Sequence, residues 1–529
     1  MYSLGIELST QSCKLVVLDV TSSHVIYTGN FDYDSTFPEY GTRGGVLLFE
    51  DSEIRHTSPF MLIEALGNIF DKLKNDGIEL SQIKAVKADG MQHCTVYTDE
   101  SFGKRIRILD PRSELLEQLH FTVSRKTSPI WEDRSPVQEA DYLKGKGGIE
   151  SLTGNRAELR FPAAQILKWA KESPDEYTKT SNIFLLSAFI TSILAGKIAP
   201  VDTGDGWGTN LNDLNINNPG WSKEALSAAD AYLHDHGVEA PLETKIGAIN
   251  HYDSYVGTIN SYFVEKYGVD PEAIVLTGTG DNPATLLGCG GQAVISLGSS
   301  YTVNGVMRDV TPSTTGEYNV FGYIPKTAMA LSVITNGGKV HEYFLRKYIV
   351  SSDDKEIKKK DWEDYVTAGG DSLLSENEKL MLPYFQDESV PLRGKGIVRD
   401  DFSADDVHDN VRALFTSQVL SLKLHSTHLS DVDSICIAGG GAANRFMMQL
   451  ISDIFKTETY IIKHADFAAP LGCAISGARA FLNISYKEAI KRFVQKETSS
   501  FLYPIKENLP KVDLLLDRYR VLEREAGTE

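Results

Sequence analysis

The sequence predicts an α/β protein of two related domains that share one cleft. With 529 residues the chain is too long for a single hydrophobic core, so two large domains are expected. Two segments roughly 290 residues apart, 4–17 and 293–303, each contain an apolar strand, a polar turn with adjacent hydroxyl residues and a second apolar strand. This approximate repeat predicts that each domain offers a hydroxyl-lined turn to a common ligand.

Composition and charge narrow the class of protein. With 42% hydrophobic and 24% charged residues the chain is globular, and its net charge of −19 argues against general binding to nucleic acid or anionic membranes. The five cysteines lack C-x-x-C spacing, which predicts small buried residues in a reducing compartment rather than disulfides or a zinc site. The most apolar stretch, 183–195, is too short to span a bilayer and is expected to form a core helix. Because no signal-peptide core begins the sequence, we expect a soluble cytoplasmic protein.

The stretch 273–290 points most directly to chemistry. Its apolar run at 273–276 predicts a buried strand, and Asp281 and Asn282 follow before Pro283, which is expected to open a helix. Open α/β sheets place catalytic groups where a strand ends and a helix begins, so Asp281 is a candidate catalytic carboxylate. Taken alone, the segment is equally consistent with a tight turn in which Asp281 caps the helix.

Polar side chains follow other predicted strands. The turn at 9–12 is rich in hydroxyls and suits a phosphate chain, although a plain hairpin has a similar sequence. Gln92 and His93 follow a buried strand at 83–88, where they would hydrogen-bond a hydroxylated ligand. A structural histidine is the alternative at this position.

Three further segments are candidates. Trp131 precedes charged residues, a pattern typical of sugar sites, although a core tryptophan is the default expectation. Arg160 stands just before a helix opened by proline, within reach of an anionic or hydroxylated ligand. Glycines 439–441 lie between a strand at 434–438 and a helix expected at 445–455, where a flat or anionic ligand would rest on the backbone.

Seven short motifs follow one another between Gly5 and Gly477. They are Gly-Ile-Glu-Leu-Ser-Thr-Gln-Ser at 5–12, Gln-His at 92–93, Trp-Glu-Asp at 131–133, Leu-Thr-Gly-Asn-Arg at 152–156, Thr-Gly-Asp-Asn-Pro at 279–283, Ser-Leu-Gly-Ser-Ser at 296–300 and Gly-Gly-Gly-Ala-Ala-Asn at 439–444. Their order and spacing resemble the FGGY family of carbohydrate kinases, and within it the eukaryotic-type kinases that act on D-xylulose. The resemblance implies two actin/hexokinase-like (ribonuclease H-like) domains with a catalytic cleft between them, an N-terminal domain at 1–290 and a C-terminal domain at 291–529.

The same resemblance assigns the site residues by position. Asp281 would be the general base. The residues that hold the ketose would be His93, Arg160, Asp281 and Asn282, with Gln92 beside them. The ATP-binding residues would be Ser9, Thr10 and Gln11 in the first phosphate turn, Ser299 and Ser300 in the second, and Trp362, Gly440, Gly441 and Asn444 around the adenosine.

One departure concerns the first phosphate motif. The family usually has Asp at its start and Gly before the Thr, whereas this chain has Glu7 and Ser9. Glu keeps the charge but adds a methylene group. The resemblance therefore implies a Mg²⁺ site more firmly than it implies the exact role of Glu7.

The implied reaction is the ATP- and Mg²⁺-dependent phosphorylation of D-xylulose to D-xylulose 5-phosphate, which feeds the pentose phosphate pathway. The alternatives are a kinase for another sugar or polyol, such as ribulose, glycerol or gluconate, a non-catalytic sugar-sensing paralogue, and an actin-like filament protein. Retention of Asp281 and of both phosphate turns favours an enzyme over a sensor. The expected partners are sugar and ATP, without nucleic acid or membrane, for a monomer or homodimer.

Overall fold

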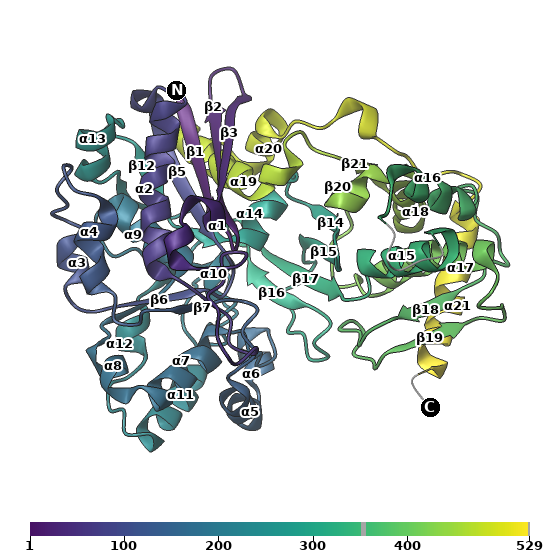
Figure 1. Cartoon of the computed structure of the whole chain (residues 1–529), viewed down its shortest axis with the longest axis horizontal. Coiled ribbons are helices and arrows are strands. Elements are labelled where there is room, and N and C mark those ends of the chain that lie inside the picture. The colour runs from purple at the N-terminus through teal and green to yellow at the C-terminus, as the bar shows by residue number, and fades with distance from the viewer. Residues whose placement is uncertain (351–355, 527–529) are drawn as a thin grey trace.

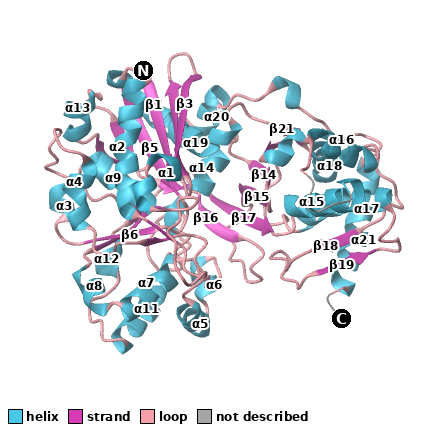
Figure 2. Cartoon of the chain, viewed as in Figure 1, coloured by secondary structure: helices cyan, strands magenta, loops and turns pink. Residues whose placement is uncertain are grey.

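The computed structural model describes residues 1–350 and 356–526, which form two mixed β-sheets with helices packed on them (Figures 1 and 2). The first sheet has the strand order β11-β12-β5-β1-β2-β3, with β13 paired to β5. Its strands are β1 (Tyr2–Leu8), β2 (Ser12–Asp19), β3 (His24–Asp32), β5 (Ile83–Gly90), β11 (Tyr255–Thr258), β12 (Ile274–Leu276) and β13 (Thr279–Gly280).

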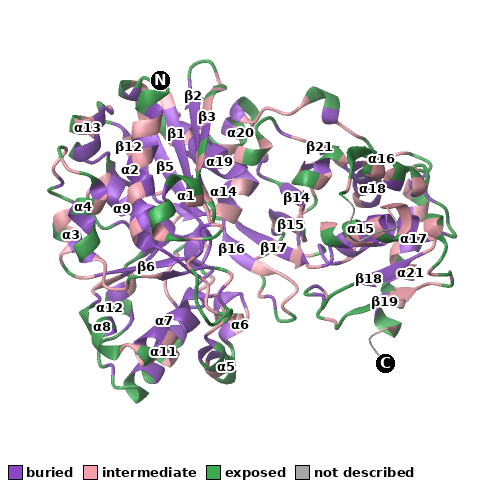
Figure 3. Ribbon diagram, in the orientation of Figure 1, coloured by how far each residue is buried: buried purple, intermediate pink, exposed green. Residues whose placement is uncertain are grey.

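The second sheet has the order β16-β17-β15-β14-β20-β21. Its strands are β14 (Ala293–Leu297), β15 (Tyr301–Val306), β16 (Asn319–Gly322), β17 (Ala328–Ile334), β20 (Ser434–Ala438) and β21 (Glu458–Tyr460). Figure 3 shows that the strands of both sheets are largely buried, whereas many of the surrounding helices expose their outer faces.

The two sheets repeat one topology. In the first, β3, β2 and β1 are antiparallel, and β5 and β12 continue parallel to β1. In the second, β17, β15 and β14 are antiparallel, and β20 and β21 continue parallel to β14. The β1–β2 and β14–β15 hairpins therefore occupy equivalent places, and the predicted α/β class with its internal repeat is confirmed.

Two helices, α14 (Asp281–Gly288) and α19 (Ala468–Leu482), connect the halves of the molecule (Figure 1). Although α19 follows the second sheet in sequence, it packs on the first, where the Ser3 hydroxyl donates to the Ala474 carbonyl at 2.7 Å. The two helices cross so closely that a side chain at Gly288 or Gly472 would run into the backbone of the other helix. The domain limit at residue 290 remains a prediction.

The remaining elements complete the layers. Around the first sheet are α1 (Tyr33–Thr36), α2 (Pro59–Asn75), α3 (Phe102–Arg105), α4 (Leu115–Leu119), α9 (Leu186–Ala195), α10 (Thr203–Gly206), α13 (Ser261–Tyr267) and α20 (Tyr486–Phe493). A helical region below that sheet in Figure 1 comprises α5 (Val137–Gly145), α6 (Ile149–Thr153), α7 (Pro162–Glu172), α8 (Pro174–Lys179), α11 (Lys223–Asp235) and α12 (Glu243–Ile246), and most of these helices share a core cluster of their own. Around the second sheet are α15 (Gly338–Leu345), α16 (Lys359–Ala368), α17 (Val407–Leu424), α18 (Arg445–Phe455) and α21 (Leu509–Glu525). Short two-stranded pairs are β4 (His56–Thr57) with β7 (Ser128–Pro129), β6 (Thr95–Thr98) with β8 (Asn182–Leu185), β9 (Val201–Asp202) with β10 (Ile249–Asn250), and β18 (Met381–Tyr384) with β19 (Gly396–Arg399).

One expectation about the core is wrong in part. The apolar stretch 183–195 begins as strand β8, which pairs with β6, and only from Leu186 does it continue as helix α9. Pairing with β6 overrides the helical pattern because a short apolar run suits a buried strand as well as a helix. All five cysteines are buried and free, as predicted. Among the described helices, none combines the length and the hydropathy that a membrane span requires.

Candidate active site

Asp281 lies at the first turn of α14, directly after the last residue that pairs with the first sheet. Gly280 pairs with Gly90 of β5 and is the N-cap residue, so helical geometry begins at Asp281 and not at Pro283. This corrects both the expected helix start and the alternative in which Asp281 caps the helix. The N-cap position belongs to Gly280 and not to Asp281.

The surroundings of Asp281 suit a proton acceptor at neutral pH. Burial, aided by the nearby charge of Glu7, raises the pKa of Asp281 from 3.8 to about 7. The backbone N–H groups of Gln92 and Asn282 oppose this rise because they donate to the carboxylate. The Asn282 amide also donates to Asp281 Oδ1 at 2.9 Å, which orients the carboxylate.

Two more carboxylates, Glu7 and Asp89, stand side by side at the ends of β1 and β5. The two residues pair directly in the parallel register of β1 and β5. Glu7 is 6% exposed and Asp89 is fully buried. Burial raises the pKa of both, and in Asp89 the charges of Glu7 and Asp281 add to this effect. Sequence reasoning missed Asp89, and the available signal was its position at the end of a buried strand that enters the Gln92-His93 motif.

These carboxylates fit a magnesium ion in their donor chemistry. Glu7 Oε2 lies 3.5 Å from Lys14 Nζ, and neither this oxygen nor Asp89 Oδ1 has a hydrogen-bond partner in the described part of the chain. Mg²⁺ prefers carboxylate oxygens and usually shares its shell with substrate phosphates. Within residues 1–350 and 356–526, no cluster of three or more His, Cys, Asp or Glu side chains is arranged to hold a metal.

His93 is a buried, neutral histidine with one ring nitrogen left as an acceptor. Its Nδ1 lies 2.8 Å from the carbonyl of Gly208, and because a carbonyl only accepts, Nδ1 carries the proton and Nε2 has a free lone pair. Burial lowers the pKa of His93 to about 3, with the charge of Arg160 acting in the same direction, so the ring is neutral. The ring stacks on Phe161 at a centroid distance of 4.4 Å, which fixes its plane.

Arg160 and Gln92 are the other predicted sugar-site residues near this histidine; the charge of Arg160 acts on His93, and Gln92 precedes it in the chain. An Arg160 guanidinium nitrogen donates to Asn319 Oδ1 at 3.0 Å, so β16 of the second sheet reaches the predicted sugar site. The Gln92 amide donates to the Gly204 carbonyl at 3.1 Å and to Asp205 Oδ1 at 3.2 Å, and Gln92 is 3% exposed. These contacts make Gln92 a buried support, with only its Oε1 left for a ligand.

The first phosphate turn is held by an internal hydrogen bond and by a contact from Trp131. In the first turn the Ser9 hydroxyl donates to the Ser12 carbonyl at 3.0 Å, while Gln11 is exposed. Trp131 is 46% exposed, not a core residue as expected by default, and its Nε1 donates to Thr10 Oγ1 at 3.0 Å. The core side chain of this segment is Asp133 instead, which is fully buried.

The second turn lies against the start of α15. The backbone N–H groups of Gly338 and Lys339 donate to the carbonyls of Gly298 and Ser299. The Ser300 hydroxyl donates to the Thr335 carbonyl at 3.4 Å. The turn is thereby fixed at the edge of a large cavity.

That cavity has a volume of about 960 Å³ and lies in the C-terminal half. It brings together predicted ATP-binding residues from three separate segments, namely Ser299, Trp362, Gly440, Gly441 and Asn444. Trp362 on α16 is 39% exposed and meets Tyr365 edge-to-face. Asn444 caps α18 through its Oδ1, which accepts from the N–H groups of Phe446 and Met447, so its amide protons remain for a ligand.

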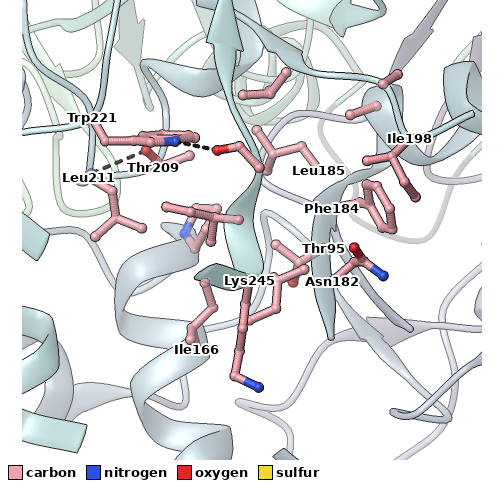
Figure 4. A pocket seen from close by; sticks show the side chains of 17 residues that line it. Thr95, Ile166, Asn182, Phe184, Leu185, Ile198, Thr209, Leu211, Trp221 and Lys245 are labelled. Atoms are coloured by element: carbon pink, nitrogen blue, oxygen red, sulfur yellow. Dashed lines mark hydrogen bonds between the residues drawn. The ribbon is translucent and has the colours of Figure 1, made fainter. Parts of the chain in front are cut away.

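A second, smaller cavity lies between β8 and the helices α7, α9 and α12 (Figure 4). It measures about 40 Å³, and Ile166, Lys245 and Trp221 are among the residues that line it. This volume suits a few water molecules and is too small for a sugar. None of the predicted site residues lines it.

Two sheets of repeated topology, a carboxylate at the start of α14 after the first sheet and a large cavity beside the second are the arrangement expected of a two-domain sugar kinase. The model of the C-terminal domain of the FGGY family of carbohydrate kinases matches residues 293–481. Xylulose kinase 2 of Arabidopsis thaliana is 32% identical, with 90% of this chain and 87% of the relative covered, and xylulose kinase of Mus musculus is 29% identical over 98% and 94%. The crystal structure of xylulose kinase from Rhodospirillum rubrum has a TM-score of 0.79 at 13% identity, with 100% of this chain and 99% of that chain covered. The chain belongs to the FGGY family of carbohydrate kinases.

Proposed function

We propose that this carbohydrate kinase transfers the γ-phosphoryl group of ATP to D-xylulose and forms D-xylulose 5-phosphate. The observation that carries the proposal is the position of Asp281, a carboxylate with a pKa of about 7 at the start of α14, beside the end of β5 that leads into Gln92 and His93. A proton acceptor and a neutral sugar-binding imidazole therefore belong to one site. The names of the relatives from Arabidopsis thaliana and Mus musculus support D-xylulose as the sugar.

Asp281 acts as the general base in this proposal. As the terminal hydroxyl oxygen of the sugar attacks the γ-phosphorus, its proton passes to Asp281 and ADP leaves. Proton transfer by a positioned base typically contributes ~10²–10⁴-fold to the rate. A pKa near 7 suits the task because much of the carboxylate is ionised at neutral pH and still has appreciable basicity.

His93 and Arg160 would select which hydroxyl faces the phosphate. The lone pair on His93 Nε2 accepts a hydrogen bond from a sugar hydroxyl, whereas Arg160 donates to sugar oxygens. Asn282 would add a polar contact at the same end of the sugar. Holding one hydroxyl in line with the phosphorus is an orientation effect.

The nucleotide would bind in the 960 Å³ cavity with its base on Trp362 and its phosphates directed to Ser299, Ser300 and the first turn. Glu7, with Asp89 beside it, would hold Mg²⁺, which neutralises phosphate charge when it is bound. The two domains would span residues 1–290 and 291–529, and the protein would act in the cytoplasm as a monomer or homodimer.

The test is ADP release from MgATP with D-xylulose, D-ribulose, L-xylulose, glycerol and no sugar, for the wild type and Asp281→Ala. Turnover on D-xylulose that is lost in the variant supports the substrate and the base together. Turnover on another sugar replaces the substrate while the mechanism stands. Absence of turnover, with sugar binding retained in a calorimetric titration, overturns the proposal in favour of a sugar-sensing protein.

A further inference from the structure

An exposed tryptophan reaches across the chain to the first phosphate turn. Trp131 Nε1 lies 3.0 Å from Thr10 Oγ1, although 121 residues separate the two in sequence and 46% of Trp131 is exposed. We propose that Trp131 is a positioning residue for phosphoryl transfer, because its N–H occupies the Thr10 oxygen and leaves the Thr10 proton to be donated to the transferred phosphoryl group. The inference rests on the proposed function.

The direction of this hydrogen bond is fixed by chemistry. An indole N–H only donates, so the Thr10 oxygen is the acceptor, and the hydroxyl retains one proton of its own. That proton is directed to the sulfur of Met91 at 3.9 Å, a long contact to a weak acceptor. A charged phosphate oxygen is a far stronger acceptor and would replace the sulfur.

Two other hydroxyls of the phosphate turns, those of Ser9 and Ser300, already donate to backbone carbonyls. The Ser9 hydroxyl donates to the Ser12 carbonyl at 3.0 Å, and the Ser300 hydroxyl donates to the Thr335 carbonyl at 3.4 Å. Each would have to give up a backbone carbonyl before it could donate to phosphate. Thr10 requires only the loss of a sulfur contact, so its proton is preset for a ligand.

The backbone on both sides of Trp131 is fixed by hydrogen bonds, while the side chain of Trp131 is partly exposed to solvent. The preceding residue, Ile130, is buried and donates its N–H to the Arg55 carbonyl at 3.0 Å. Asp133 is fully buried, accepts from Gln165 Nε2 and from the Arg55 N–H at 2.8 Å each, and donates its own N–H to the Ile130 carbonyl at 2.9 Å. A partly exposed hydrogen bond on so rigid a support contributes little to folding, which points to a role in function.

The Thr10 backbone is enclosed as well. A side chain at Gly45 would run into the Thr10 carbonyl, and the Gly45 N–H is held by Asp34 Oδ1 at 3.0 Å. Gly45 has a φ of +74°, a conformation that favours glycine. With its backbone fixed by this turn and one acceptor position of its oxygen filled by Trp131, Thr10 keeps its hydroxyl proton for a ligand.

A different role for Trp131 is that of a flat surface on which the sugar rests. The two roles predict different coupling between residues 131 and 10, and a double-mutant cycle separates them. Trp131→Phe keeps an aromatic ring and removes the N–H. Thr10→Val keeps the shape of the side chain and removes the hydroxyl, and Thr10→Ser restores the hydroxyl.

The experiment measures kcat and KM for D-xylulose and for ATP in Trp131→Phe, Thr10→Val and the double variant. We expect kcat to fall about tenfold in Thr10→Val, since a hydrogen bond to a charged group is lost, and about threefold to tenfold in Trp131→Phe. The double variant should be no slower than Thr10→Val, Thr10→Ser should recover most of the rate, and the KM for D-xylulose should change less than twofold. Trp221→Phe is the matched control, because it removes an indole hydrogen bond of 2.7 Å to the Gly247 carbonyl beside the small cavity (Figure 4), and it should leave kcat unchanged.

Losses that multiply in the double variant, or a Trp131→Phe effect confined to the KM for D-xylulose, would overturn the inference and assign Trp131 to the sugar surface. An active wild type with such losses leaves the proposed function intact. A wild type that turns over no sugar overturns the proposed function and this inference with it. Melting temperatures of all variants within about 2 °C of the wild type would exclude a folding defect.

Discussion

Replacing Asp281 with Asn tests the proposed base with little change in size. The variant keeps the side-chain shape and its place on α14 but accepts no proton, so kcat should fall by ~10²–10⁴-fold. In the wild type, kcat/KM should rise with pH and reach half its plateau near pH 7, because only the ionised carboxylate accepts the proton and its pKa is about 7. The residual activity of Asp281→Asn should lack this rise.

The same substitution should stabilise the fold at neutral pH. The pKa of Asp281 is higher in the folded protein than in the unfolded chain, so ionisation opposes folding, and the cost grows as pH rises from 3.8 to about 7 and is constant above. The difference between these pKa values sets an upper limit of about 4 kcal/mol. The Asp281 residue as a whole is intermediate in exposure, and solvent screening therefore reduces the gain to about 1–2 kcal/mol, or a melting temperature higher by about 1–3 °C.

Thermal unfolding at pH 8 and pH 5, together with steady-state kinetics, checks both effects. The stability gain of Asp281→Asn should be larger at pH 8 than at pH 5, where the folded wild type is already protonated at this residue. Asn282→Asp serves as the matched control, since it adds a carboxylate next to the base and should lower the melting temperature. An unchanged kcat, or a stability gain equal at both pH values, would refute the reasoning.

Three further predictions concern the other parts of the site. His93→Leu should raise the KM for the sugar about tenfold to a hundredfold and leave its pH dependence unchanged, because burial keeps the imidazole neutral at pH 6 and 8. The titration of Asp281 is common to both proteins, so a difference in sugar affinity between pH 6 and 8 that the wild type shows and His93→Leu lacks would contradict this. Trp362→Ala should raise the KM for ATP about tenfold through lost stacking and leave the KM for the sugar unchanged, and a matching rise in both constants would argue against adenine packing on Trp362. Glu7→Gln should raise the Mg²⁺ concentration needed for half-maximal rate and weaken Mn²⁺ binding in the presence of ADP, as measured by electron paramagnetic resonance; equal Mn²⁺ affinity would remove Glu7 from the metal site.

The strands, turns and helices that depend on nearby residues could be located from the sequence. The turns at Ser9 and Ser299 lie in equivalent hairpins, and the helix after the glycine-rich turn spans 445–455 as expected. These patterns depend on residues close in sequence, whose apolar and polar order sets the backbone conformation. The error at 183–195 arose because strand β8 is fixed by its partner β6, which is 84 to 90 residues away.

Sequence by itself determined that this chain has two repeats, a carboxylate at the end of a strand and the motifs of a sugar kinase. Tertiary structure alone decided that Asp89 stands beside Glu7, that Asn319 reaches Arg160 and that Trp131 donates to Thr10. The reason is that the position of a turn follows from neighbouring residues, whereas the partner of a side chain follows from how strands and helices pack over long separations in sequence. The raised pKa of Asp281 is also decided by the tertiary structure, because Asp281 becomes buried and comes close to the charge of Glu7 only when β1, β5 and α14 pack together.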